Sequence, residues 1–154
     1  MNDTPKMWAS LEFPTKYLTD EVQQTIDWQQ ELHKTTFVIR KSHGLITIEA
    51  ESIPFGKFER LEALLIARDI PFDRIGEGNN YTDGERRVYR PATGSRPAQS
   101  RTVYLTATDG AVYVETLDIR RCLDEAYDYA SLRKMLKTLL EEVDPEISFL
   151  SDYV

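Results

Sequence analysis

The chain has 154 residues, of which 41% are hydrophobic and 29% charged, a composition that fits one folded domain and excludes a disordered chain. The formal net charge of −7 disfavours nonspecific binding to nucleic acid or to anionic membranes. The single cysteine cannot form an intramolecular disulfide, and no run approaches the roughly 20 apolar residues of a transmembrane helix, so a cytoplasmic location is expected.

The first predicted elements are a helix and a hairpin. Thr19 is a suitable N-cap for a helix over 20–34, because the acidic first turn of this segment complements the helix dipole. Two runs of β-branched and aromatic residues, 35–40 and 45–50, flank the polar loop 41–44, which ends in glycine. This pattern predicts a β-hairpin.

A second helix is predicted over 54–68, where a proline is tolerated in the first turn and apolar residues recur at helical spacing. Residues 69–75 follow as an exit turn and a strand. Because strand, helix and strand succeed one another, we expect a parallel βαβ unit with a right-handed crossover. Residues 76–84 have a loop composition, and 86–90 are suited to a short strand.

The segment 91–100 is rich in Pro, Gly, Ser and Ala, which is typical of a mobile loop. The β-rich runs 102–108 and 111–115 then flank Asp109-Gly110, a pair that accepts positive φ at both positions. Such a pair between two β-rich runs is a strong hairpin signal.

The last third of the chain is predicted to be helical, over 117–128 and 130–143. The second of these segments carries an amphipathic stripe made of Leu132, Met135, Leu136, Leu139, Leu140 and Val143. Asp144-Pro145 ends it, because a residue before proline disfavours the α region. Residues 147–150 are expected to form a terminal strand or a docked tail.

These elements predict one α+β domain over 1–154. Its sheet is expected to be mixed or mainly antiparallel, with about five strands packed by three or four helices. A mobile basic loop is expected around 77–101.

The titratable residues predict no metal site and no reactive thiol. His33 and His43 lack a second histidine or a cysteine at metal-ligand spacing. Cys122 falls on the apolar stripe of its helix and is interpreted as a small buried hydrophobe. The alternative is a reactive thiol activated by Arg120 and Arg121.

The glycines and carboxylates give no strong catalytic signal either. Gly76-Glu77-Gly78 does not open a helix as a phosphate-binding loop does. Glu49, Glu51, Asp69 and Asp73 flank the expected βαβ unit and are interpreted as a solvated surface, with a metal-dependent hydrolase as the alternative. We therefore predict no catalytic residue, no metal and no cofactor, although enzymatic activity stays open.

A basic and aromatic segment is the candidate contact surface. Residues 77–101 carry five arginines against three acids in a chain of net charge −7. Guanidinium groups bind phosphates bidentately and tyrosines stack on bases, but both residue types also anchor protein interfaces. The alternative is structural, with these arginines solvent-exposed or paired with the acidic body. The candidate residues are Tyr81, Arg86, Arg87, Tyr89, Arg90, Arg96 and Arg101.

The central sequence Gly56-x-Phe58-x-x-Leu61-Glu62-x-Leu64-Leu65, followed by Ile70-Pro71-Phe72-Asp73-Arg74, resembles small uncharacterised proteins of bacteriophages and other mobile elements. The resemblance covers about residues 45–91. It implies a prokaryotic or viral accessory protein that acts against a host system, and it brings no catalytic residues.

Together these patterns favour a noncatalytic accessory or regulatory protein that binds a protein partner. The first alternative is a nucleic-acid or nucleotide binder that uses the arginine and tyrosine residues, and a small metal-dependent hydrolase is the second. No membrane partner is expected. The oligomeric state is open, with Trp8, Leu11 and Phe13 either forming a dimer arm or covering the core.

Overall fold

The computed structural model describes residues 4–78, 83–94, 96–105 and 111–154. Its elements in chain order are β1 (Lys6–Pro14), η1 (Thr15–Tyr17), α1 (Asp20–His33), β2 (Val38–Ser42), β3 (Leu45–Pro54), α2 (Glu59–Ala67), β4 (Phe72–Gly76), β5 (Gly84–Arg90), β6 (Gln99–Leu105), α3 (Thr116–Glu125), α4 (Tyr129–Val143) and η2 (Leu150–Tyr153).

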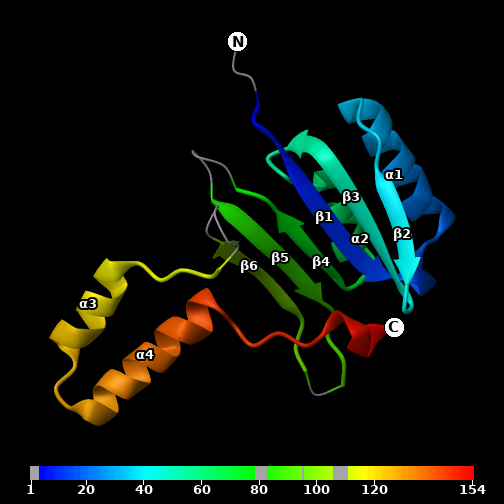
Figure 1. Ribbon diagram of the computed structural model, residues 1–154. Coiled ribbons are helices and arrows are strands. Elements are labelled where there is room, and N and C mark those ends of the chain that lie inside the picture. Colours follow the sequence, from blue (N-terminus) through cyan, green and yellow to red (C-terminus); the bar gives the residue numbers. More distant parts are fainter. Residues whose placement is uncertain (1–3, 79–82, 95, 106–110) are drawn as a thin grey trace.

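Six strands form one open sheet in the order β2-β3-β1-β4-β5-β6, and every neighbouring pair is antiparallel (Figure 1). The elements β1-α1-β2-β3-α2-β4 follow the ferredoxin-like, split βαβ arrangement, which β5 and β6 extend. The predicted α+β class is confirmed, with six strands in place of about five. The predicted parallel pairing is wrong, because β1 lies between β3 and β4 and pairs antiparallel with both.

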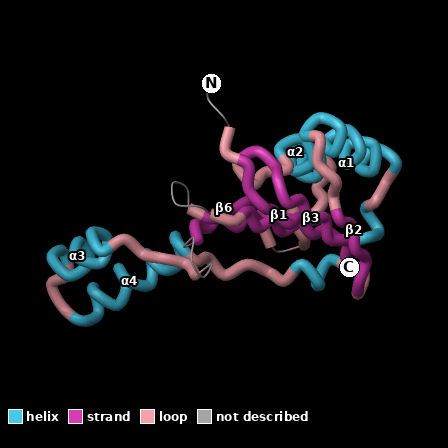
Figure 2. The backbone as a smooth tube through the Cα atoms, turned by 45° about the horizontal axis from the view of Figure 1, so that its top comes forward, coloured by secondary structure: helices cyan, strands magenta, loops and turns pink. Residues whose placement is uncertain are grey.

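The core lies between the sheet and the two helices α1 and α2, which cover one face of it (Figure 2). Strand side chains alternate between the two faces, so Ala9, Leu11 and Phe13 of β1 all point to the helices and are fully buried. Leu11 and Phe13 therefore belong to the centre of the core and do not form a dimer arm. On α1, Val22 and Ile26 complete the apolar contact.

The opposite face of the sheet is partly covered by the C-terminal segment, which crosses it as an extended chain and ends in η2 against β1 (Figure 2). Leu150 is buried there. Of the two alternatives for this segment, the docked tail is correct. The tail positions one of the predicted contact residues, as described below.

The buried amide of Gln29 links the two core helices. Its Oε1 atom accepts a hydrogen bond of 3.3 Å from the backbone N–H of Leu61, in the first turn of α2, where helix N–H groups lack intrahelical partners. We expect Gln29→Ala to lower the free energy of unfolding by about 1–3 kcal/mol, because a buried donor loses its acceptor.

Urea denaturation followed by circular dichroism measures this loss. The matched control is Gln24→Ala on the exposed side of α1, which should stay within about 0.5 kcal/mol of the parent protein. An equally small change for Gln29→Ala would mean that the amide contributes nothing as a cap.

Candidate interaction surface

The predicted basic loop at 77–101 is interrupted by strand β5, which pairs with β4 on one side and β6 on the other. Neighbouring strand residues point to opposite faces, so Arg86 and Arg87 do not share a surface. Arg86 lies on the face of the C-terminal tail and forms an ion pair of 3.2 Å with Asp73. The short strand expected at 86–90 is therefore present, and it divides the mobile basic loop expected around 77–101.

Arg90 is completely buried and has structural partners. Its Nε donates to the carbonyl of Ser148 at 2.9 Å, and its Nη1 donates to the carbonyl of Phe72 at the same distance. An ion pair of 2.7 Å joins its Nη2 to Asp73, and the ring of Tyr153 lies 5.8 Å from the guanidinium carbon. Arg90 thus fastens the C-terminal tail to the sheet and is not available as a surface contact.

Tyr89 is also buried, on the helix side of the sheet. Its ring stacks on Phe72 at a centroid distance of 6.2 Å, and its hydroxyl donates to Asp69 at 2.7 Å. Burial, followed by this hydrogen bond, raises the pKa of Tyr89 to about 12. The phenol is therefore a neutral donor in the folded protein, and the side chain is not a surface anchor.

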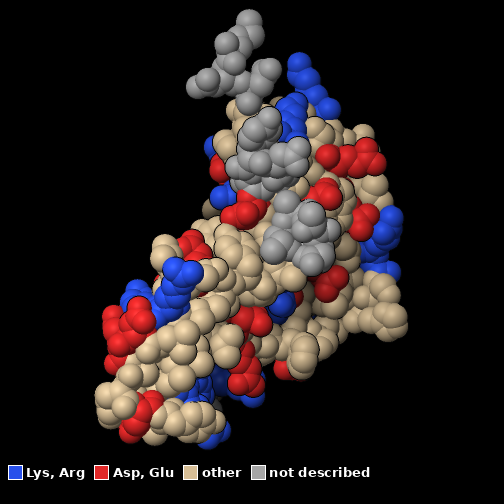
Figure 3. All heavy atoms as spheres, turned by 60° about the vertical axis from the view of Figure 1, so that its left-hand side comes forward, with Lys and Arg blue, Asp and Glu red and all other residues tan. Residues whose placement is uncertain are grey.

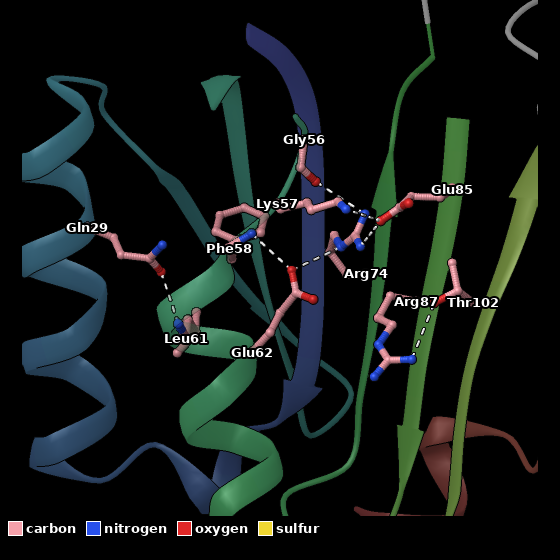
Figure 4. A network of polar contacts seen from close by, with 10 residues as sticks. All are labelled: Gln29, Gly56, Lys57, Phe58, Leu61, Glu62, Arg74, Glu85, Arg87 and Thr102. Atoms are coloured by element: carbon pink, nitrogen blue, oxygen red, sulfur yellow. Dashed lines mark hydrogen bonds and ion pairs between the residues drawn. The ribbon is translucent and has the colours of Figure 1, made fainter. Parts of the chain in front are cut away.

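The remaining candidates are divided between several positions. Arg87 lies on the helix side, where it donates to the hydroxyl of Thr102 (Figure 4). It also donates to the hydroxyl of Ser100. Arg101 lies on the tail side of β6, the face that also holds Arg86. The exposed residue Arg96 donates to Ser148 Oγ at 3.1 Å. Tyr81 lies outside the described residues. Among the described candidates, Arg86 and Arg101 share the tail side of the sheet with the buried Arg90, and Arg87 and Tyr89 share the helix side.

A buried ionic cluster next to α2 was not predicted from the sequence (Figure 4). Arg74 on β4 points to the helix side, where its Nε lies 3.0 Å from Glu62 and its Nη2 pairs with Glu85. Lys57 approaches Glu85 at 3.6 Å, and the carbonyl of Gly56 accepts a hydrogen bond from Arg74 at 3.2 Å. Two cations and two carboxylates thus neutralise each other.

Close backbone packing forms one wall of this cluster. Gly56 has φ of +63°, and a Cβ atom on Gly76 would lie 3.0 Å from the Gly56 carbonyl oxygen and 3.0 Å from Arg74 Nη1. A side chain at position 76 would therefore displace Arg74. With its charges paired inside a packed wall, the cluster has a structural role.

The alternative chemistries gain no support from the described residues. Within that part of the chain, no group of three His, Cys, Asp or Glu side chains could hold a metal ion. Glu49, a candidate for the hydrolase alternative, instead pairs with Arg40 at 3.1 Å on the surface. Ser42 and His43 contact each other at 2.6 Å in the β2–β3 turn, but both are exposed.

Helices α3 and α4 form a hairpin that stands away from the sheet (Figures 1 and 2). A capping box starts α4: Asp128 accepts from the N–H of Ser131 at 2.7 Å, and Ser131 Oγ accepts from the N–H of Asp128 at 3.1 Å. The two predicted helices are confirmed, although α3 ends earlier than expected.

The second strand of the predicted β-hairpin is absent at 111–115, where only a bridge from Val112 to Leu105 occurs. Its turn lies outside the described residues.

One side of this helical hairpin contains a groove with a volume of about 560 Å³. Its floor is apolar, with Cys122 and Leu139 almost completely buried beside Met135. Cys122 thus occupies the buried position predicted for a small hydrophobe. The exposed residues Tyr127 and Thr138 also line the groove. So do four charged residues of both signs, namely Arg121, Glu125, Lys134 and Glu142. We call this feature the hairpin groove.

The other side of the hairpin carries a second apolar surface. Ile119 and Leu123 of α3 are 40% and 56% exposed, and Leu140 of α4 is 56% exposed. At helical spacing Leu136 lies beside Leu140. None of these four residues lines the groove. Figure 3 shows a band of uncharged residues along the hairpin, bordered by residues of both charges. We call these four residues the outer apolar face.

Comparison with known proteins identifies no relative of this chain: no family model, curated protein or solved structure matches it. Within the residues that the structure describes, no helix has both the length and the apolar character needed to cross a membrane.

Proposed function

We propose that this protein is a noncatalytic accessory or regulatory protein that binds another protein through the hairpin groove. The observation that carries the proposal is the groove itself, an apolar floor with a charged rim on a hairpin that stands clear of the sheet. A groove of this kind suits an amphipathic helix of the partner, whose apolar side chains reach the floor while its polar side chains meet the rim.

The charges of the rim favour a protein over a nucleic acid. Arg121 and Lys134 line the groove together with Glu125 and Glu142, whereas a phosphate backbone requires a continuous basic surface. Tyr127, at the tip of the hairpin, is 88% exposed. Exposed tyrosines are frequent energetic anchors of protein interfaces.

Under this proposal the target is a host protein, as the resemblance to proteins of bacteriophages and mobile elements, expected from the sequence, implies. The residues that carry it lie in α2 and β4 and in the segments next to them, away from the hairpin. Under this proposal, α2 and β4 build the scaffold and α3 and α4 select the partner.

The proposal predicts that a double substitution in the groove, Tyr127→Ala with Thr138→Arg, removes partner binding. The alanine deletes the aromatic anchor, and the arginine fills the groove without disturbing the core, because Thr138 is exposed. Proteins captured from bacterial lysate by the parent chain are identified, purified and titrated against both chains. Affinity should fall by at least roughly 30-fold, the equivalent of one interface anchor.

The matched control makes the same two substitutions elsewhere, as Tyr104→Ala with Thr36→Arg, at residues that are also exposed. This control should bind like the parent. Equal binding by the groove variant would contradict the proposal. Capture of nucleic acid alone, lost in Arg86→Ala/Arg101→Ala and weakened steeply by salt, would favour the nucleic-acid alternative.

A further inference from the structure

The outer apolar face exposes three large apolar side chains to water. Leu123 and Leu140 are each 56% exposed, and Ile119 is 40% exposed. Contiguous exposed apolar surface of this kind marks an interaction site in soluble proteins. The hairpin groove lies on the other side of the same two helices, so an occupant of the outer face leaves the groove free.

The charges on α4 are ordered along the helix. Beside the outer apolar face, at helical spacing, Arg133 and Lys137 occupy its first two thirds and Glu141 follows near its end, whereas Lys134 and Glu142 line the groove. Two parallel copies of α4 would place like charges beside each other, which is unfavourable. In an antiparallel pair, the basic part of each copy lies beside the acidic part of the other. The helix is thus electrostatically complementary to its own antiparallel copy.

The apolar residues follow the same symmetry. A two-fold axis that passes between Leu136 and Leu140 on the outer face brings Leu136 of one copy next to Leu140 of the other, and the reverse contact follows automatically. Such an isologous contact is the commonest way in which identical chains associate. Two helical hairpins joined in this way form a four-helix bundle, in which apolar side chains of all four helices are covered.

We infer that a second copy of this chain covers the outer apolar face, with the two α4 helices antiparallel across a two-fold axis. The inference goes beyond the proposed function, because the dimer contact uses Ile119, Leu123, Leu136 and Leu140, none of which lines the hairpin groove. Each dimer therefore presents two grooves, one on each hairpin.

Analytical ultracentrifugation of the full chain tests the inference. The parent protein should sediment with twice the chain mass of 17.8 kDa, and Leu140→Glu should sediment with the mass of one chain. The matched control is Leu32→Glu on α1, because Leu32 is 55% exposed against 56% for Leu140. That control should remain dimeric. A parent chain that stays monomeric at about 100 μM, or a Leu140→Glu variant that stays dimeric, overturns the inference.

A charge-reversal experiment identifies the partner as the same chain. The acidic variant Arg133→Glu/Lys137→Glu and the basic variant Glu141→Lys should each be monomeric alone, because the charged side chains of α4 beside the outer apolar face then carry one sign of charge. Mixed in equal amounts, they should form a dimer that contains one chain of each kind. Failure to associate on mixing contradicts the antiparallel pairing.

The dimer and the proposed function can fail separately. Leu140→Glu should keep the protein partner of the hairpin groove, and Tyr127→Ala/Thr138→Arg should keep the dimer. If the parent is monomeric but the groove variant still loses its partner, only the inference of a dimer is wrong. A dimer without any groove partner would leave the inference standing and remove the proposed function.

Discussion

Replacing Arg74 by alanine is expected to lower the free energy of unfolding by about 3–5 kcal/mol, the usual cost of removing one partner from a buried ion pair. The Arg74 side chain is 2% exposed, and those of Glu62 and Glu85 are 12% and 16% exposed. Without the guanidinium, two carboxylates remain in a largely dry site with one lysine to balance them. The Gly56 carbonyl also loses the hydrogen bond from Arg74.

The measurement is urea denaturation at neutral pH, with Arg40→Ala as the matched control. Arg40 also pairs with a glutamate, Glu49, but its side chain is 66% exposed. Water screens that pair, so its loss should cost less than about 1 kcal/mol. Similar losses for both variants would mean that water reaches the Arg74 cluster and screens it in the same way.

The sequence alone predicted elements with strong local signals. The helix expected over 20–34 corresponds to α1 at Asp20–His33, and the Thr19 side chain accepts from Val22 N–H, as expected of an N-cap. The glycine-ended loop expected at 41–44 is shorter in the structure, where residues 43 and 44 form the turn and residues 41 and 42 still belong to β2. These elements depend on caps and turns within a few residues, where the pattern of residue types is sufficient.

Strand β1 was missed because its partners are distant in the sequence. Met7, Ala9, Leu11 and Phe13 alternate with polar or larger residues, which is a strand pattern, but the segment precedes any predicted element that it could pair with. Because β1 lies between β3 and β4, these two strands do not pair with each other, as the expected parallel βαβ unit would require. The order of strands in a sheet depends on contacts between distant segments, which local sequence patterns do not specify.

The arginine surface was predicted from composition, which does not reveal which way each side chain points. Arg86 and Arg87 are neighbours in the sequence but lie on opposite faces of β5. The burial of Arg90 depends on Ser148 and Tyr153, in a tail that follows two intervening helices. The amphipathic stripe of α4 was recognised, yet the exposure of its Leu140 became visible only in the folded hairpin.

Replacing Arg90 by alanine should lower the free energy of unfolding by about 3–5 kcal/mol, because Asp73 would keep a charge without its fully buried partner. The C-terminal tail should also loosen, since the Ser148 carbonyl and the Tyr153 ring both contact Arg90. Hydrogen exchange of residues 146–153 should accelerate in the variant. Arg101→Ala, an exposed arginine on the same side of the sheet, should change neither quantity measurably.

The same two variants decide between the interpretations of the arginine segment. If Arg90 has the structural role described above, Arg90→Ala reduces stability and tail protection, and partner binding falls only in proportion to the unfolded fraction. If the arginine surface predicted from composition is correct, the tail must open to expose Arg90. Partner binding would then be lost in Arg90→Ala at temperatures where the variant is still folded. That result would contradict partner binding at the hairpin groove, because binding would depend on an arginine of the sheet.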